Sequence, residues 1–166
     1  EIEIRLVDGL ILPNLMQHRG DGPDRSGEGD RCPFLSAAGR CGIHPWRPGF
    51  CRLYPMGRYY TGEGFRYILQ KDECTDRAGT PVLLRDWLGI EDLPRYEAFV
   101  LDWHDFCRRA EKGMEKLTER SIDSVRRYLL QLFFVHPYEM AMDFYPQYAA
   151  RMEVCREALV EILNQI

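Results

Sequence analysis

Four cysteines in an irregular stretch of sequence are the feature that most limits how this chain can fold. From Cys32 to Tyr60 glycine and proline recur and no helical period is sustained, so irregular backbone is expected there. Something other than regular secondary structure must hold such a segment, and thiolates that converge on a metal ion or cluster can do so. We therefore predict a metal centre. Its predicted ligands are Cys32, Cys41, Cys51 and Cys74.

The spacing of these cysteines leaves the kind of metal open. Successive ligands are separated by 8, 9 and 22 residues. This spacing is neither the paired Cys-x-x-Cys pattern of zinc ribbons nor the Cys-x-x-Cys-x-x-Cys run of ferredoxins. An iron–sulfur cluster of the [4Fe–4S] type is the first hypothesis, and a zinc ion is the alternative.

The residues around Cys51 favour a metal centre over buried free thiols. Arg47 and Arg52 lie beside this cysteine, and guanidinium groups offset the negative charge of a thiolate-bound centre through hydrogen bonds. His44 is a candidate ligand, or a hydrogen-bond donor to one. Cysteines that pack as small hydrophobic side chains belong on apolar faces, not among Gly, Pro and Arg. We predict that His44, Arg47 and Arg52 contact the bound group.

The other cysteines have a different setting. Cys107 and Cys155 fall on the apolar faces of predicted helices, and we expect them to pack in the core. A framework of disulfides is not expected, because such frameworks stabilise small secreted chains, and 166 residues are enough to bury a core.

The cysteine region carries a combination of short motifs. They are Cys-Pro-Phe-Leu at 32–35, Gly-x-Cys-x-Ile-His at 39–44, Arg-Pro-x-x-Cys-Arg at 47–52 and Tyr-Pro at 54–55, followed by Cys74. Together these motifs resemble the YkgJ-like family of zinc- or iron-chelating cysteine-cluster proteins over about residues 9 to 74. The resemblance implies iron–sulfur or zinc binding. Some members are likened to iron–sulfur oxidoreductases, and flagellin lysine methylases carry a similar cysteine region.

One departure from that family concerns the number of ligands. Members usually carry a Cys-x-x-Cys-x-x-Cys-Cys run ahead of the matching region, and this sequence has no cysteine before Cys32. The sequence begins at Glu1 without a methionine, so we expect either that the run is absent or that it precedes Glu1. In the second case the four cysteines form part of a larger set of ligands.

The remaining sequence shows strand patterns first and helical patterns later. In residues 2–16 apolar and polar side chains alternate around the turn signal Asp8-Gly9, which predicts a hairpin. Residues 17–31 are almost all polar and predict an exposed loop. Residues 64–70 predict a strand that leads to Cys74. Apolar residues three and four apart predict the helices that follow. The predicted helices span residues 80–87, 94–117, 121–135 and 146 to the C-terminus. The first should have Pro81 in its first turn and Gly89 near its end. In the third, the run 128–135 should be the most buried segment of the chain.

These elements predict an α+β fold that is mainly α. An irregular, metal-stapled N-terminal module with short strands should pack on a C-terminal array of three or four helices. We place the cysteine-rich module at residues 1–78 and the helical region at 79–166, and expect the two to form one continuous domain.

Charge and hydropathy narrow the classes of function. A formal net charge of -4 disfavours nucleic acid as a partner. No apolar run is long enough to span a bilayer and no signal peptide is evident, so we predict a cytoplasmic protein whose partner is a protein redox partner or protein substrate. Neither a Gly-rich phosphate loop nor a Gly-x-Ser-x-Gly elbow occurs. No catalytic residue is therefore assigned.

Overall fold

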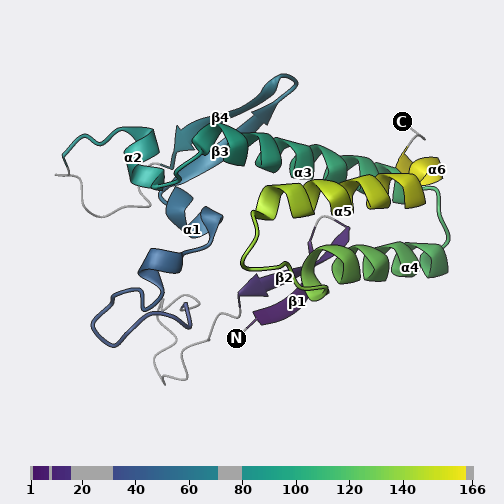
Figure 1. Cartoon of the computed structure of the whole chain (residues 1–166), viewed down its shortest axis with the longest axis horizontal. Helices are drawn as coiled ribbons and strands as arrows, with labels where there is room; N and C mark the ends of the chain where they lie inside the picture. Colours follow the sequence, from purple (N-terminus) through teal and green to yellow (C-terminus); the bar gives the residue numbers. More distant parts are fainter. Residues whose placement is uncertain (1, 8, 16–31, 71–79, 164–166) are drawn as a thin grey trace. The chain divides into compact units, whose positions relative to one another are not determined.

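The computed structural model describes residues 2–7, 9–15, 32–70 and 80–163. The chain divides into two compact units, each taken here by itself. The helical unit comprises residues 1–35 and 104–166, and the loop unit comprises residues 36–103. Helix α3 (Leu93–Met114) contributes residues to both (Figure 1). The predicted boundary between residues 78 and 79 falls outside the described residues and stays a prediction.

Helices make up most of the regular structure. In the part of the chain that the structure describes, 53% of residues are helical and 17% are in strands, so helix outweighs strand about threefold. The strands form two antiparallel pairs. The predicted fold class, α+β and mainly α, is confirmed.

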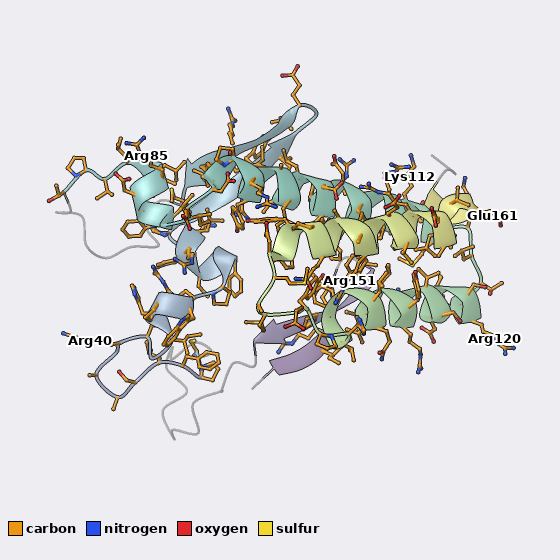
Figure 2. All side chains as sticks on the ribbon, viewed as in Figure 1. Arg40, Arg85, Lys112, Arg120, Arg151 and Glu161 are labelled. Carbon is orange, nitrogen blue, oxygen red and sulfur yellow. The ribbon has the colours of Figure 1, made fainter. Side chains whose placement is uncertain are left out.

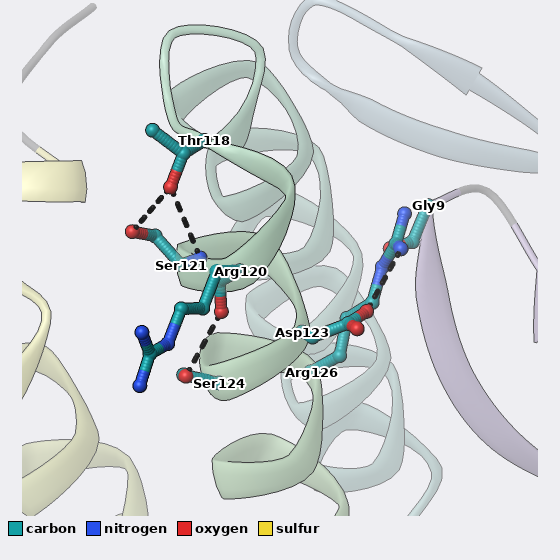
Figure 3. A network of polar contacts seen from close by, with 7 residues as sticks. All are labelled: Gly9, Thr118, Arg120, Ser121, Asp123, Ser124 and Arg126. Atoms are coloured by element: carbon teal, nitrogen blue, oxygen red, sulfur yellow. Dashed lines mark hydrogen bonds and ion pairs between the residues drawn. The ribbon is translucent and has the colours of Figure 1, made fainter.

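The N-terminal hairpin belongs to the helical unit. Strand β1 (Ile2–Val7) pairs antiparallel with β2 (Leu10–Leu15), and Val7 faces Leu10 across the turn. This confirms the predicted hairpin, whereas the polar loop predicted at 17–31 lies outside the described residues. Strand β2 contacts helix α4 and buries Leu10. Arg126 on α4 fixes the turn, because its Nε donates a hydrogen bond of 2.8 Å to the carbonyl oxygen of Gly9 (Figure 3).

Two helices of the helical unit begin at capping side chains. Helix α4 (Glu119–Leu130) starts where Thr118 Oγ1 accepts a hydrogen bond of 3.3 Å from the backbone N–H of Ser121 (Figure 3). It continues as a π-helical segment, η2 (Gln131–Val135), which ends before His136-Pro137 as predicted. Asp143 caps α5 (Phe144–Ala158) in the same way, and α6 (Val160–Leu163) follows.

The core of the helical unit follows the predicted spacing of apolar residues. Helices α3, α4 and α5 bury side chains three or four residues apart, so one face of each packs inward. The ring centroids of Phe106 and Phe133 lie 5.9 Å apart, and those of Phe133 and Tyr148 lie 6.1 Å apart. The buried hydrophobic residues are Leu10, Phe106, Ala110, Met114, Val125, Leu129, Phe133, Tyr148, Met152, Cys155 and Leu159.

The prediction that 128–135 is the most buried segment is wrong. Leu129 and Phe133 are buried, but Phe134 is 42% exposed and Val135 is 53% exposed. The physical reason is that α4 and η2 face the core on one side only. A continuous apolar run on such a helix therefore leaves part of its surface in water.

The loop unit contains short elements. They are η1 (His44–Trp46), α1 (Gly49–Leu53), β3 (Met56–Thr61), β4 (Gly64–Leu69), α2 (Leu84–Leu88) and the first part of α3. Strand β4 confirms the predicted strand. Its partner β3 corrects the expectation that residues up to 60 are irregular, because Met56–Thr61 pairs residue by residue with Gly64–Leu69. Strand β3 could not be predicted from its own composition, because the hydrogen bonds that stabilise it come from the partner strand β4.

Helix α2 is shorter than predicted. It begins at Leu84, and Pro81 lies ahead of it instead of in its first turn. Leu83, in extended conformation, caps the helix without a side-chain hydrogen bond. The end is as expected, because Gly89 adopts φ 57° and its N–H bonds to the carbonyl oxygen of Arg85.

Candidate metal centre

The structure describes three of the four predicted ligands. Cys41 and Cys51 belong to the loop unit and are half-buried, whereas Cys32 is exposed and belongs to the helical unit. Cys74 lies outside the described residues. Among the residues that are described, no three His, Cys, Asp or Glu side chains gather where they could hold a metal ion. The four-cysteine set therefore stays a prediction.

A tight turn leads into Cys41. The backbone N–H of Ser36 donates to the carbonyl oxygen of Arg40 at 2.9 Å, and Ser36 Oγ accepts from the N–H of Arg40 at 3.1 Å. Gly39 adopts φ 72°, a conformation that favours glycine. The conformation of this turn therefore explains the glycine of the Gly-x-Cys motif, which lies two residues before Cys41.

Cys51 lies on the short helix α1. Pro48 precedes the helix, and Gly49 begins it. A Cβ at Gly49 would collide with the hydroxyl oxygen of Tyr96 on α3, so only glycine allows this close contact. Tyr96 is a residue that sequence reasoning missed, because its contact with residue 49 is long-range.

Arg52 ties the loop around the cysteines to helix α2. Its Nε donates to the carbonyl oxygen of Arg47 at 3.1 Å, Nη2 to that of Pro45 at 3.0 Å and Nη1 to that of Gly89 at 3.4 Å. Arg47 Nε in turn donates to the carbonyl oxygen of His44 at 3.1 Å. Both guanidinium groups therefore order the backbone. Their predicted contact with a bound cluster, like that of His44, stays a prediction.

The cysteine segment, residues 32–62, carries positively charged side chains and no acidic ones. Between residues 32 and 62 the sequence holds four arginines and no aspartate or glutamate, although the whole chain carries a net charge of -4. One of these arginines, Arg40, extends away from the backbone on the turn before Cys41 (Figure 2). Guanidinium groups can offset the negative charge of a thiolate-bound centre through hydrogen bonds.

The same segment lacks an apolar core. Among the described residues of the loop unit only Leu53 and Leu88 are buried, and none between residues 36 and 52 is. The hydrogen bonds to backbone described above are therefore interactions that order residues 36–52 without a buried apolar side chain.

Arg58 occupies an aromatic cluster that sequence reasoning also missed. Its guanidinium carbon lies 5.4 Å from the ring centroids of Phe65 and Tyr96 and 5.9 Å from that of Tyr67. Arg58 Nη2 donates to the Tyr96 hydroxyl at 2.8 Å. Burial, and then the 2.9 Å hydrogen bond to Glu97, raises the pKa of Tyr67 to about 12. The cluster packs β3 and β4 on α3, and the alternation of aromatic residues in β4 was its sequence signal.

An apolar hollow of about 360 Å³ lies elsewhere in the loop unit. Trp87 forms one wall, and its Nε1 donates to the carbonyl oxygen of Tyr54 at 3.1 Å. Thr80 carries the one hydroxyl among the side chains that line it. Without an acid, a base or a nucleophilic thiol, this hollow offers no catalytic set. Its lining residues are Pro55, Met56, Leu69, Thr80, Val82, Leu84 and Trp87.

Cys155 behaves as predicted for a core residue. Its side chain is fully buried on α5, and burial raises the pKa of its thiol from an ordinary value of 9.0 to about 12. Such a thiol is neither a nucleophile nor a metal ligand at neutral pH. Cys107 on α3 is half-buried.

Comparison of the chain with protein-family models, curated proteins and solved structures finds no match in any of the three. The resemblance to the cysteine-cluster family stays a prediction that rests on the motifs themselves. No helix in the described part of the chain is both long and apolar enough to cross a membrane.

Proposed function

We propose that this chain is a metal-centre protein in which Cys32, Cys41, Cys51 and Cys74 hold a [4Fe–4S] cluster, used for electron transfer or cluster-assisted redox chemistry. The observation that carries the proposal is the sequence between residues 32 and 62, where three of the four proposed ligands alternate with arginines and acidic residues are absent. Four thiolates are the ligands of such a cluster, which supplies one-electron chemistry when bound.

The lack of buried side chains supports a bound group of this kind. Residues 36–52 include half-buried side chains but none that is fully buried, so an apolar core contributes little to the stability of their conformation. Bonds from Cys41 and Cys51 to a metal would add the missing free energy, as they do in small metal-binding modules. The hydrogen bonds of Arg52 then have the role of ordering the backbone between the two ligands.

The same observation favours a second candidate, a structural site. A zinc ion, or a cluster that does not change its redox state, would also stabilise residues 36–52. The chain would then bind a protein partner or take part in modifying a protein, as the resemblance to lysine methylases implies. In either case we propose a cytoplasmic location, where thiolates stay reduced, and a protein as the redox or substrate partner.

Cysteine variants test the ligand set. We expect Cys41→Ser, Cys51→Ser and Cys74→Ser each to lower bound metal to about a tenth or less of that in the unmodified chain, because each removes one thiolate. Cys155→Ala is the matched control, since it deletes a thiol that is buried in the core of the helical unit. It should leave the metal content unchanged. Full metal content in all three serine variants would contradict the proposed ligands.

A further inference from the structure

Residues 4–7 of strand β1 are exposed. Of its apolar side chains that the structure describes, Ile4 is 58%, Leu6 62% and Val7 40% exposed. Strand β2 covers one edge of β1, and within the described residues no strand pairs with the other edge. Proteins normally cover or charge an apolar edge strand, because its unpaired N–H and C=O groups attract another strand.

The register of the hairpin fixes which backbone groups face that open edge. Ile4 lies opposite Pro13 of β2. In an antiparallel pair, hydrogen-bonded and non-hydrogen-bonded positions alternate, and proline has no N–H to donate, so it suits a non-hydrogen-bonded position. The N–H and C=O of Ile4 therefore point away from β2. By the same alternation those of Ile2 and Leu6 also point to the open edge.

The sequence of β1 is complementary to itself. It reads Ile2-Glu3-Ile4-Arg5-Leu6, so a second copy that runs antiparallel, with a two-fold axis at Ile4, places Glu3 of each copy opposite Arg5 of the other. The two charge pairs take the non-hydrogen-bonded positions, where side chains approach most closely. Ile4 then faces its own copy, and Ile2 faces Leu6.

The charges also select this register over its neighbours. An axis at Glu3 places the two copies of Glu3 opposite each other, and an axis at Arg5 does the same for the arginines. Like charges directly opposite one another destabilise strand pairing. Only the axis at Ile4, among these three, makes every facing charge pair attractive.

We propose that two copies of this chain associate through the open edge of β1, antiparallel and centred on Ile4. The result is a continuous four-stranded sheet, in the order β2–β1–β1–β2, with the same surface used on both copies. Pairing satisfies the backbone N–H and C=O groups of the open edge and brings apolar side chains of the two copies side by side. This association is independent of the proposed metal centre.

Charge exchange tests the interface and its register. Light scattering and sedimentation of the full 166-residue chain should show a dimer. Arg5→Glu places two carboxylates opposite each other at each charge pair, and Glu3→Arg places two guanidinium groups there. Each change should weaken dimerisation by about tenfold or more, because two pairs change from attractive to repulsive.

Mixing the two variants gives the decisive result. In a dimer with one copy of each variant, every facing pair again joins an arginine and a glutamate. Equal amounts of Arg5→Glu and Glu3→Arg chains should therefore form a mixed dimer, although each is monomeric alone. The double variant should dimerise with itself for the same reason. Recovery by mixing also shows that the single variants are folded.

Three results would overturn the proposal. They are a wild-type chain that stays monomeric at high concentration, a dimer that neither single change weakens, and a mixture of the two variants that remains monomeric. The second result would place the interface elsewhere on the molecule, and the third would exclude the register centred on Ile4.

Discussion

At the scale of the residue, burial decides the chemistry of the cysteines. Cys155 lies among the side chains of the helical core, where the charged thiolate is strongly disfavoured. Cys41 and Cys51 are only half-buried and lie in a segment with four arginines. The burial of Cys155 therefore keeps its thiol neutral, and metal binding is proposed for Cys41 and Cys51 but not for Cys155.

The raised pKa of Cys155 predicts how stability depends on pH. The folded state holds the thiol neutral up to about pH 12, whereas the unfolded state releases its proton near pH 9. Below pH 9 the contribution of this thiol to stability is fully present, and it is lost as the pH rises toward 12. Between about pH 8 and pH 10 the unfolding free energy should fall by about 1 kcal/mol more in the wild type than in Cys155→Ala.

Urea unfolding of both proteins at neutral and alkaline pH measures this difference. The other ionisable groups are present in both chains, so their effects cancel in the comparison except at Tyr128, whose pKa is raised first by burial and then by the charge of Cys155. A difference in free energy that stays constant from pH 7 to pH 10, within the roughly 0.5 kcal/mol expected of independent measurements, would contradict the burial of the thiol.

Single residues were predicted well where the signal was local and poorly where it was not. Cys155 was placed in the core because its neighbours at helical spacing are apolar. The hydrogen bonds of Arg52 and the aromatic cluster around Arg58 were not foreseen. Both depend on backbone or side chains more than thirty residues away, such as Gly89 and Tyr96, and no local pattern encodes those contacts.

At the scale of the element, Arg151 holds the connection between η2 and α5. Its Nη1 donates to the carbonyl oxygens of Leu132 and His136, both at 2.8 Å, and its Nη2 donates to that of Pro137 at 2.6 Å. Its guanidinium carbon also lies 3.6 Å from the centroid of the Tyr138 ring. Figure 2 shows Arg151 extending from α5 toward this connection. The carbonyl groups at the end of a helix need such donors.

Replacement of this arginine should destabilise the chain. Arg151→Gln removes most of these hydrogen bonds and the contact with Tyr138, so we expect a loss of about 2 to 3 kcal/mol in unfolding free energy. Arg151→Lys keeps the charge but not the planar fork and should recover only part of the loss. Arg108→Gln, at an exposed position of α3, is the control and should change stability by no more than about 0.5 kcal/mol. Equal effects of the changes at 151 and 108 would contradict this role.

The ends of elements could be predicted where a cap or a proline marks them. His136-Pro137 ends η2, Gly89 ends α2 and the turn after Val7 closes the first hairpin. The start of α2 and the strand β3 could not be predicted. In these two cases, contacts with neighbouring segments determine the backbone conformation more than the local amino-acid composition does.

At the scale of the whole molecule, the two units are stabilised in different ways. The helical unit has a continuous apolar core from its helices and hairpin, whereas the described part of the loop unit buries only Leu53 and Leu88. The helical fold class was predictable because periodic apolar residues encode such a core. Whether Cys32, Cys41, Cys51 and Cys74 converge could not be predicted from the sequence, because spacing along an irregular chain does not fix distances in space.

The measurement that tests the central claim most directly is the metal and acid-labile sulfide content of the full chain, purified without oxygen and combined with an absorption spectrum. We expect about four irons and four sulfides per chain and a broad visible band, as for a four-cysteine cubane. The band should bleach on reduction. One zinc and no sulfide would contradict the redox function and leave the structural site, and a chain without iron or zinc would contradict the metal centre altogether.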